Sequence, residues 1–270
     1  MACERTEPPV KKGICLGCLP SDLDALGQMK LAREAGFDGV EINTPASDAE
    51  AEDLRAKAQQ AGIEIHSVMD SLHWECPLSD PDEAVRRRGM ESLKASIRAA
   101  KITGANAVLV VPGVVNDTVT YEQAWERSMA GLKELAPYAA EHGVPLCVEN
   151  VWNKFLLSPR EMVEFIDAID SPFVQAYFDV GNIVLYGNGD QWLKSLGKRV
   201  KKIHLKDFSR GEMRFVYLFQ GDVPWQRVMH ALAAIGYGDY LTAEMGPYRG
   251  CPGITAYDIS RHIDHLFGMV

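Results

Sequence analysis

The sequence lacks long apolar runs, an excess of positive charge and a cysteine-rich pattern. A membrane-spanning helix needs about 20 consecutive apolar residues, and the apolar runs here are all much shorter. The 37 acidic residues outnumber the 28 lysines and arginines, so that the net charge is −9. A non-specific nucleic-acid or acidic-membrane binder needs a basic face. We therefore expect neither nucleic acid nor a membrane among the partners.

The sequence also lacks the signs of secretion. Residues 1–13 are polar and contain two prolines, whereas a signal peptide has an apolar central region. Six cysteines in 270 residues are too few for a disulfide framework. Cys15 and Cys18 form a CxxC pair, but no second pair completes a zinc site. We therefore expect a cytoplasmic protein with reduced cysteines and a flexible N-terminal segment over residues 1–12.

What the sequence contains is a globular composition and a repeated pattern of short apolar and longer amphipathic runs. Hydrophobic residues make up 47% of the chain and charged residues 24%, as in ordinary globular domains. The expected strands cover residues 14–19, 39–42, 63–68, 107–111, 146–149, 174–178, 200–205 and 240–243. The expected helices cover residues 22–35, 48–61, 82–103, 121–142, 158–169, 191–196, 224–235 and 258–267.

Eight alternating strand–helix units predict a single (β/α)8 TIM barrel over residues 1–270. Such units form a parallel sheet with right-handed crossovers, and eight of them in about 250 residues have the size of a closed barrel. A doubly wound open sheet is the alternative. It would carry a glycine-rich dinucleotide-binding turn after its first strand, and Gly17 alone does not make one.

Polar side chains end four consecutive strands of this barrel. In (β/α)8 barrels the active site lies at the carboxyl ends of the strands. Three carboxylates that converge there without a cation would raise one another's pKa, and a divalent metal ion removes that cost. Three oxygen ligands and one imidazole suit Mn²⁺ or Mg²⁺, with Co²⁺ or Zn²⁺ as alternatives. The candidate ligands are Glu149, Asp179, His204 and Glu244.

Five segments carry a resemblance that covers nearly the whole chain. They are GFDGVEIN at 36–43, PLCVEN at 145–150, YFDVGN at 177–182, KKIHLKD at 201–207 and GDYLTAEM at 238–245. Together they resemble the xylose-isomerase-like barrel superfamily of sugar isomerases and epimerases. The resemblance is closest to its sugar-phosphate isomerases and 3-epimerases, including the L-xylulose-5-phosphate 3-epimerase and hexulose-6-phosphate isomerase types.

This resemblance implies roles for particular residues. It implies that the four strand-end residues bind the metal and that Glu149 and Glu244 also form the acid/base pair. Arg210 stands where related ketose 3-epimerases place an arginine near substrate and metal. Asn182 stands where the free-ketose epimerases have a histidine, whereas the sugar-phosphate members share the DVGN form. The superfamily's DNA-repair endonucleases need several more histidines than this chain offers, which argues against that activity.

The chemistry that fits these residues is proton transfer beside a carbonyl group. Removal of the proton alpha to a carbonyl gives a cis-enediolate, which a divalent ion stabilises as a Lewis acid. One carboxylate takes the proton, and epimerisation needs a second on the opposite face. We therefore predict a sugar or sugar-phosphate isomerase or epimerase. The alternatives are a metal-dependent dehydratase of the inosose dehydratase type and a non-catalytic sugar-binding barrel.

Other polar residues near the strand ends are candidates for substrate binding. His66 and Glu41 could each bind a substrate hydroxyl, or instead cap the rim or support the residues that contact metal and substrate. Trp74 lies with His73 in a loop of about 13 residues after the third strand, which is long enough for a lid. Its indole could stack on a sugar or anchor the loop.

The basic residues after the later strands could bind an anion. Lys154, Lys206 and Arg210 together could hold a phosphate, although lysines near a barrel rim are often only solvated. Asp207 could orient His204 or hold Arg210. The sequence is also compatible with a homo-oligomer.

Overall fold

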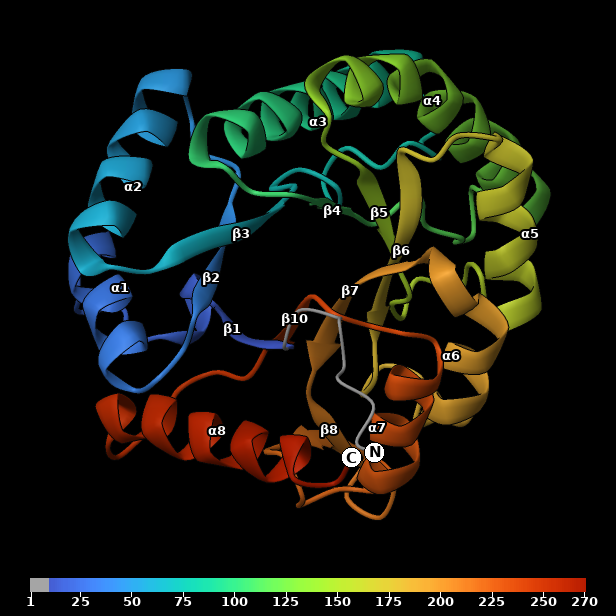
Figure 1. The fold of residues 1–270 in the computed structure, drawn as a ribbon. Helices are drawn as coiled ribbons and strands as arrows, with labels where there is room; N and C mark the ends of the chain where they lie inside the picture. The colour runs from blue at the N-terminus through green and yellow to red at the C-terminus, as the bar shows by residue number, and fades with distance from the viewer. Residues whose placement is uncertain (1–9) are drawn as a thin grey trace, which may run out of the picture.

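Within residues 10–270, which this computed structural model describes, eight parallel strands close into a barrel. The order of strands around it is β1-β10-β7-β6-β5-β4-β3-β2, as Figure 1 shows. The predicted (β/α)8 barrel is therefore confirmed, and the open sheet is excluded. The barrel strands are β1 (Lys11–Cys15), β2 (Gly39–Asn43), β3 (Glu64–Met69), β4 (Val108–Val110), β5 (Leu146–Glu149), β6 (Val174–Asp179), β7 (Val200–Leu205) and β10 (Tyr240–Ala243).

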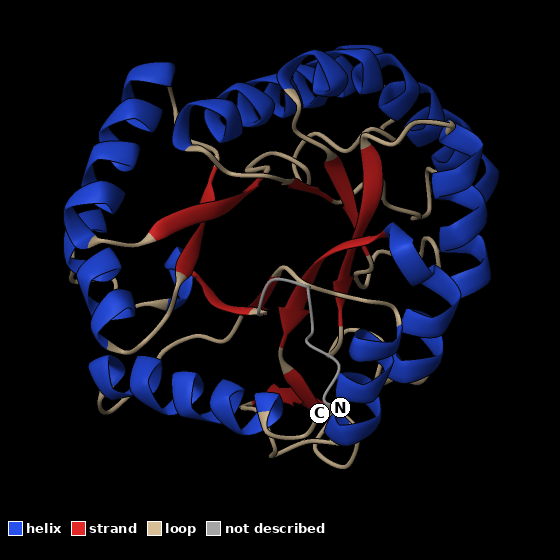
Figure 2. Cartoon of the chain, in the orientation of Figure 1, coloured by secondary structure: helices blue, strands red, loops and turns tan. Residues whose placement is uncertain are grey.

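In the described part of the chain, eight α-helices surround the strands, as seen in Figure 2. Several begin and end with strong local signals. Thr120 and Ser158 each form a capping box with the residue three positions later, and Gly62 and Gly104 end their helices in the left-handed conformation. The helices are α1 (Ala25–Glu34), α2 (Asp48–Ala61), α3 (Glu83–Thr103), α4 (Tyr121–His142), α5 (Pro159–Ile169), α6 (Gly189–Leu196), α7 (Trp225–Ala234) and α8 (Pro252–Phe267).

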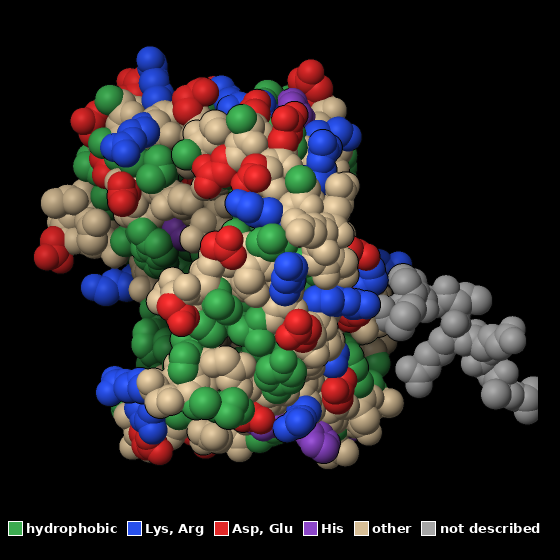
Figure 3. Space-filling view, turned by 90° about the vertical axis from the view of Figure 1, so that its left-hand side faces the viewer, with side chains coloured by type: hydrophobic (Ala, Val, Ile, Leu, Met, Phe, Trp, Pro, Cys, Tyr) green, Lys and Arg blue, Asp and Glu red, His purple; other side chains and the backbone are tan. Residues whose placement is uncertain are grey.

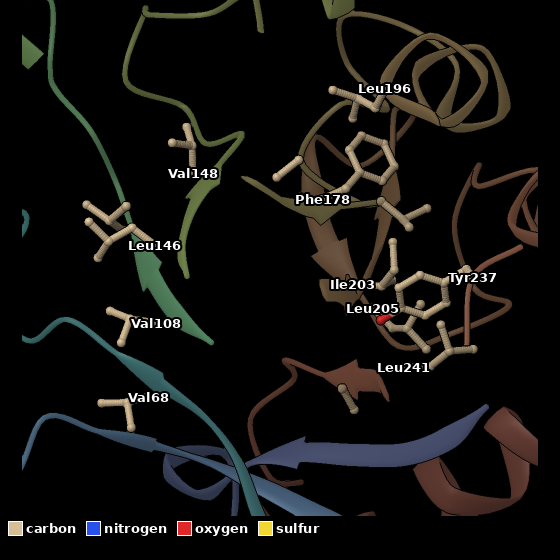
Figure 4. Packing of buried hydrophobic residues seen from close by; sticks show 14 of the residues in the cluster. Val68, Val108, Leu146, Val148, Phe178, Leu196, Ile203, Leu205, Tyr237 and Leu241 are labelled. Carbon is tan, nitrogen blue, oxygen red and sulfur yellow. The ribbon is translucent and has the colours of Figure 1, made fainter. Parts of the chain in front are cut away.

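The alternation of side chains along the strands separates an apolar layer from a polar interior. Ile203 and Leu205 of β7 belong to the large hydrophobic core cluster that joins the strands to the helices, part of which appears in Figure 4. Lys202 and His204, which alternate with them, are buried and lie among polar partners. The strands therefore direct every second residue into the barrel, where the polar groups collect.

Two parts of the chain differ from the sequence prediction. Strand β1 begins at Lys11 and ends at Cys15, and residues Leu16–Cys18 form a 3-10 turn. The bounds of the strand expected over residues 14–19 are thus wrong. The flexible segment expected over residues 1–12 is wrong at residues 11 and 12, which lie in β1. Residues 1–9 of that segment lie outside the described part of the chain. After β7, a short antiparallel hairpin of β8 (Asp207–Ser209) and β9 (Arg214–Val216) was not predicted.

The surface carries mixed charge. On the face shown in Figure 3, acidic and basic side chains are interspersed, and hydrophobic side chains gather on its lower half. None of the helices among the described residues is both long and apolar enough to span a membrane.

Candidate active site

Four neighbouring strands of the barrel bring the predicted ligand residues together at its carboxyl end. Glu149 ends β5, Asp179 ends β6, His204 lies in β7 and Glu244 follows β10. One ligand atom from each lies within 4.8 Å of the ligand atoms of the other three. The alternation of side chains explains this meeting, because each residue occupies an inward position near the end of its strand.

His204 joins this cluster to a second layer of polar groups deeper in the barrel. Its Nδ1 lies 2.9 Å from Glu149 Oε1 and 3.5 Å from Glu244 Oε2. Its Nε2 lies 2.9 Å from Glu41 Oε1, and the Tyr177 hydroxyl donates to Glu41 Oε2 at 2.7 Å. Glu41 thus holds the far side of the imidazole, which leaves Nδ1 directed at the carboxylates.

The pKa values of the two glutamates are shifted in opposite directions. Burial raises the pKa of Glu149 to about 7, against the opposing effect of His204. Burial also acts to raise the pKa of Glu244, but His204 and Lys206 outweigh it and hold that pKa below its ordinary value. Near neutral pH one carboxyl group therefore holds a proton readily while the other is ionised, which is the division of roles that acid/base pairs use.

The cluster holds more carboxylates than cations. Asp179 Oδ2 is buried and accepts no hydrogen bond from residues 10–270, although the Lys206 ammonium lies 3.1 Å away as an ion-pair partner, and burial raises the pKa of this carboxyl group. An acidic oxygen without a donor in the interior is costly unless a positive charge faces it. Three carboxylates and one imidazole nitrogen are a suitable donor set for a divalent ion. The residues present therefore fit a divalent metal site.

A second set of possible metal ligands lies on the other side of His204, deeper in the barrel. Cys15, Glu41 and His204 also offer atoms close to one another. Both oxygens of Glu41 already have hydrogen-bond partners, and Cys15 donates to Glu41 Oε1 at 3.3 Å. We interpret this set as the support of His204 and not as a metal site.

The sequence profile of the xylose isomerase-like TIM barrel family matches residues 29–264. The chain belongs to this family. L-ribulose-5-phosphate 3-epimerase UlaE of Salmonella paratyphi A is 27% identical over 245 residues, which cover 85% of each chain. Among solved structures, D-psicose 3-epimerase of Clostridium cellulolyticum H10 has a TM-score of 0.80 at 20% identity and covers 96% of this chain and 99% of its own. A structure of L-ribulose 3-epimerase also has a TM-score of 0.80 at 20% identity, over 96% and 94%.

Two residues that we expected at the carboxyl-end rim of the barrel lie deeper inside it. His66 is not the end of β3, which continues to Met69. Its ring stacks on Tyr240 at 4.0 Å, and its nitrogens lie 3.3 Å from Lys202 Nζ and from Thr242 Oγ1. This position favours a supporting role for His66 over a contact with substrate. The same holds for Glu41, which contacts His204 and Tyr177.

Asn182 and Asp207 hold loops in place. The Asn182 amide donates to the Asn150 carbonyl at 2.9 Å, and the Asn150 amide donates to the Asp179 carbonyl at 2.8 Å. Asn182 thus ties the ends of β5 and β6 together. Asp207 accepts from the backbone of Phe219 and Val223 and from the Trp225 indole. It therefore organises the segment before α7, and the expected contact with His204 or Arg210 is wrong.

The three basic candidates face different partners. The Lys206 ammonium lies between carboxylates of the cluster, 2.5 Å from Glu244 Oε2 and 3.1 Å from Asp179 Oδ2. The Arg210 guanidinium donates to the Val184 carbonyl at 2.8 and 3.0 Å. Lys154 is exposed. Lys206 therefore pairs with the carboxylates of the cluster. The three basic side chains do not gather into the phosphate-binding group that we expected.

The loop after β3 contains a buried histidine beside an exposed tryptophan. Trp74 is 53% exposed and meets the His73 ring edge-on at 5.7 Å. Burial lowers the pKa of His73 to about 4, although the charges of Glu41 and Glu244 oppose this shift. Because the loop follows β3 at the carboxyl end of the barrel, it belongs to the mouth of the site.

Two aromatic contributors to the site were missed in the sequence. Tyr177 stands two positions before Asp179 in β6, so strand alternation could have placed it on the inner face. Phe215 of β9 has no such signal, because the hairpin was not predicted. It stacks on Trp152 at 4.9 Å and lies with Lys206 and Glu244 around a pocket of about 480 Å³. This pocket opens beside the carboxylate cluster.

Proposed function

We propose that the protein is a divalent-metal-dependent epimerase or isomerase of a sugar or sugar phosphate. The observation that carries this proposal is the meeting of Glu149 and Glu244 at His204, within a cluster of three carboxylates and one imidazole that fits a divalent ion. The 3-epimerase names of its relatives support the same reaction class.

The proposed reaction needs two carboxyl groups and a cation. A divalent ion held by Glu149, Asp179, His204 and Glu244 would supply Lewis-acid polarisation of the substrate's carbonyl. Of the two glutamates, the ionised one accepts the proton from the carbon beside the carbonyl group. The protonated one returns a proton to the opposite face, which inverts the carbon centre. General acid–base catalysis of this kind contributes about 10²- to 10⁴-fold to the rate.

We further propose that the substrate carries a phosphate group. The relative at 27% identity is named for a pentulose 5-phosphate, and Lys154 and Arg210 follow strands β5 and β7 at the carboxyl end. Kinetics on matched sugars with and without phosphate test this point. Equal kcat/KM for both forms would remove phosphate from the proposal.

A substrate panel in D₂O tests the reaction itself. Ketoses and ketose phosphates are incubated with the protein and Mn²⁺ or Mg²⁺, and NMR follows the products and deuterium at the carbon beside the carbonyl group. We expect deuterium incorporation together with an epimer or isomer, and loss of both after treatment with EDTA. Loss of water from the substrate would favour the dehydratase. Binding without any exchange would favour a sugar-binding barrel.

A further inference from the structure

The ammonium group of Lys206 occupies the acidic cluster itself. Lys206 directly follows β7, two residues after His204, and its side chain is 13% exposed. Its Nζ lies 2.5 Å from Glu244 Oε2 and 3.1 Å from Asp179 Oδ2. Both oxygens belong to residues of the candidate metal site. The positive charge that this cluster requires is therefore supplied by the chain's own lysine.

The neighbouring elements leave room for this arrangement of the lysine. A Cβ atom at Gly181 would lie 2.6 Å from Lys206 Cγ and 2.7 Å from the Lys206 carbonyl oxygen. A glycine after β6 is therefore needed for Lys206 to pass beside it. On the other side, Nζ lies 5.0 Å from the centre of the Phe215 ring, where the face of an aromatic ring attracts a cation.

A lysine ammonium and a divalent ion compete for the same carboxylates. An ammonium group has three donors and no acceptor, so it cannot be a metal ligand. A divalent ion bound to Asp179 and Glu244 would draw on the negative charge that Nζ now faces, and two cations at short range repel each other. Metal binding therefore opposes the ion pairs of Lys206.

We propose that Lys206 is a built-in counter-cation, which holds the carboxylate cluster together in the metal-free protein and is displaced when a divalent ion binds. The displaced ammonium has a place to go, because Lys206 lines the pocket of about 480 Å³ together with Phe215, Tyr217 and Gln220. There it faces the space beside Glu244 that a substrate would enter. This inference depends on the metal site of the proposed function and not on the identity of the sugar.

Metal titration by calorimetry tests the competition without any measurement of turnover. The variants are Lys206→Met, which removes the charge, and Lys206→Arg, which keeps it. Lys201→Met is the matched control, because Lys201 lies in β7, the strand that Lys206 follows, but pairs with Asp239, 2.9 Å away and outside the cluster. We expect Lys206→Met to bind Mn²⁺ about tenfold or more tightly than wild type. The other two variants should stay close to wild type. Equal or weaker binding by Lys206→Met would overturn the proposal.

Chemical labelling of the unmodified protein tests the displacement directly. Acetylation of Lys206 and Lys201 is followed by mass spectrometry of peptides with and without Mn²⁺. We expect Mn²⁺ to speed the labelling of Lys206 and to leave Lys201 unchanged. Unchanged or slower labelling of Lys206 with metal bound contradicts displacement, even if a variant fails to fold. If neither wild type nor Lys206→Met binds a divalent ion, the metal site of the proposed function fails as well. Equal binding by both removes only this inference.

Discussion

The two ends of the barrel interior hold buried charge in different ways. At the amino end, Lys202 is fully buried and donates to Asp239 Oδ1 at 2.6 Å, while Asp239 Oδ2 accepts from Lys201 at 2.9 Å and from the Asn106 amide at 3.1 Å. At the carboxyl end, Glu149, Asp179 and Glu244 meet around the single ammonium of Lys206, and Asp179 Oδ2, 3.1 Å from it, accepts no hydrogen bond from the described residues. Both oxygens of Asp239 have donors at the amino end, whereas the cluster at the carboxyl end has more carboxylates than lysines.

The packing at the amino end explains why we assign it to stability. His66 stacks on Tyr240 above Lys202, and burial keeps the pKa of His66 well below its ordinary value, so the ring adds no charge. A Cβ atom at Gly39 would come within 2.6 Å of the Tyr240 ring, so only glycine fits there. A buried charge with all its partners in place stabilises the fold. A buried cluster with more carboxylates than cations is better explained by a ligand.

The largest effect should follow from changes in the glutamate pair. Glu149→Gln and Glu244→Gln keep an oxygen ligand but remove the proton-accepting group, so each should lower turnover about 10²- to 10⁴-fold. Steady-state kinetics with measured Mn²⁺ occupancy checks this, because metal loss would have the same result. Glu212→Gln is the control, since Glu212 pairs with Arg214 on the exposed hairpin. Wild-type turnover by either variant with metal bound would contradict the acid/base assignment.

The next largest effect should come from the complete charge pair at the amino end. Asp239→Asn leaves the Lys202 ammonium buried without its partner, and this should lower the free energy of unfolding by about 3–5 kcal/mol. Urea unfolding measures it. Asp167→Asn is the control, because Asp167 pairs with Arg199 on the surface, where a pair is worth about 1 kcal/mol or less. Equal losses from the two variants would remove the distinction that we draw for the amino end.

The pH dependence of stability should also report the amino-terminal pair. Burial opposes ionisation of Asp239, but Lys202 and Lys201 outweigh it and hold its pKa well below the ordinary value. A carboxyl group with a lowered folded-state pKa stabilises the fold above its unfolded-state pKa of about 3.9. That stabilisation is lost as the pH falls through the folded-state pKa. The difference in stability between wild type and Asp239→Asn should therefore be constant from pH 7 to 5 and shrink below about pH 4. A constant difference down to pH 3 would contradict the shift.

The fold was predictable because its signals are local and repeated. The hydrophobic periodicity and the helix-end signals located the eight strand–helix units. Within these units, only the first and last residues of strands and helices differ from the prediction. The first strand was misplaced because its opening residues, Lys11 and Lys12, look like part of a polar tail. In the fold their ammonium groups reach Glu64 and Asp264, both at 2.8 Å, from a strand that still pairs with its neighbours.

The site was predictable only in part, because strand alternation gives the face of a residue but not its depth. His66 and Glu41 point inward as expected, yet the pairing of the tilted strands places them below the rim. Asp207 finds its partners 12 to 18 residues later in the chain. Nothing in the segment HLKD shows that the lysine turns back to the carboxylates.

The smallest effect on stability should come from removing a charge at the carboxyl end. Whether the free energy of unfolding falls there, as at the amino end, separates the two regions. Asp179→Asn removes one of the two carboxylates that face the Lys206 ammonium, which keeps Glu244 Oε2 at 2.5 Å, and the asparagine oxygen can still accept from the Asn182 backbone as Asp179 Oδ1 does at 2.6 Å. The metal-free variant should therefore unfold within about 1 kcal/mol of wild type, or above it, in contrast to Asp239→Asn. Added Mn²⁺ should raise the Tm of wild type and not that of Asp179→Asn, because a ligand stabilises only the form that binds it. Thermal unfolding with and without Mn²⁺ measures both effects. A loss as large as that of Asp239→Asn in the metal-free protein would mean that Asp179 is a structural charge like those of the amino end.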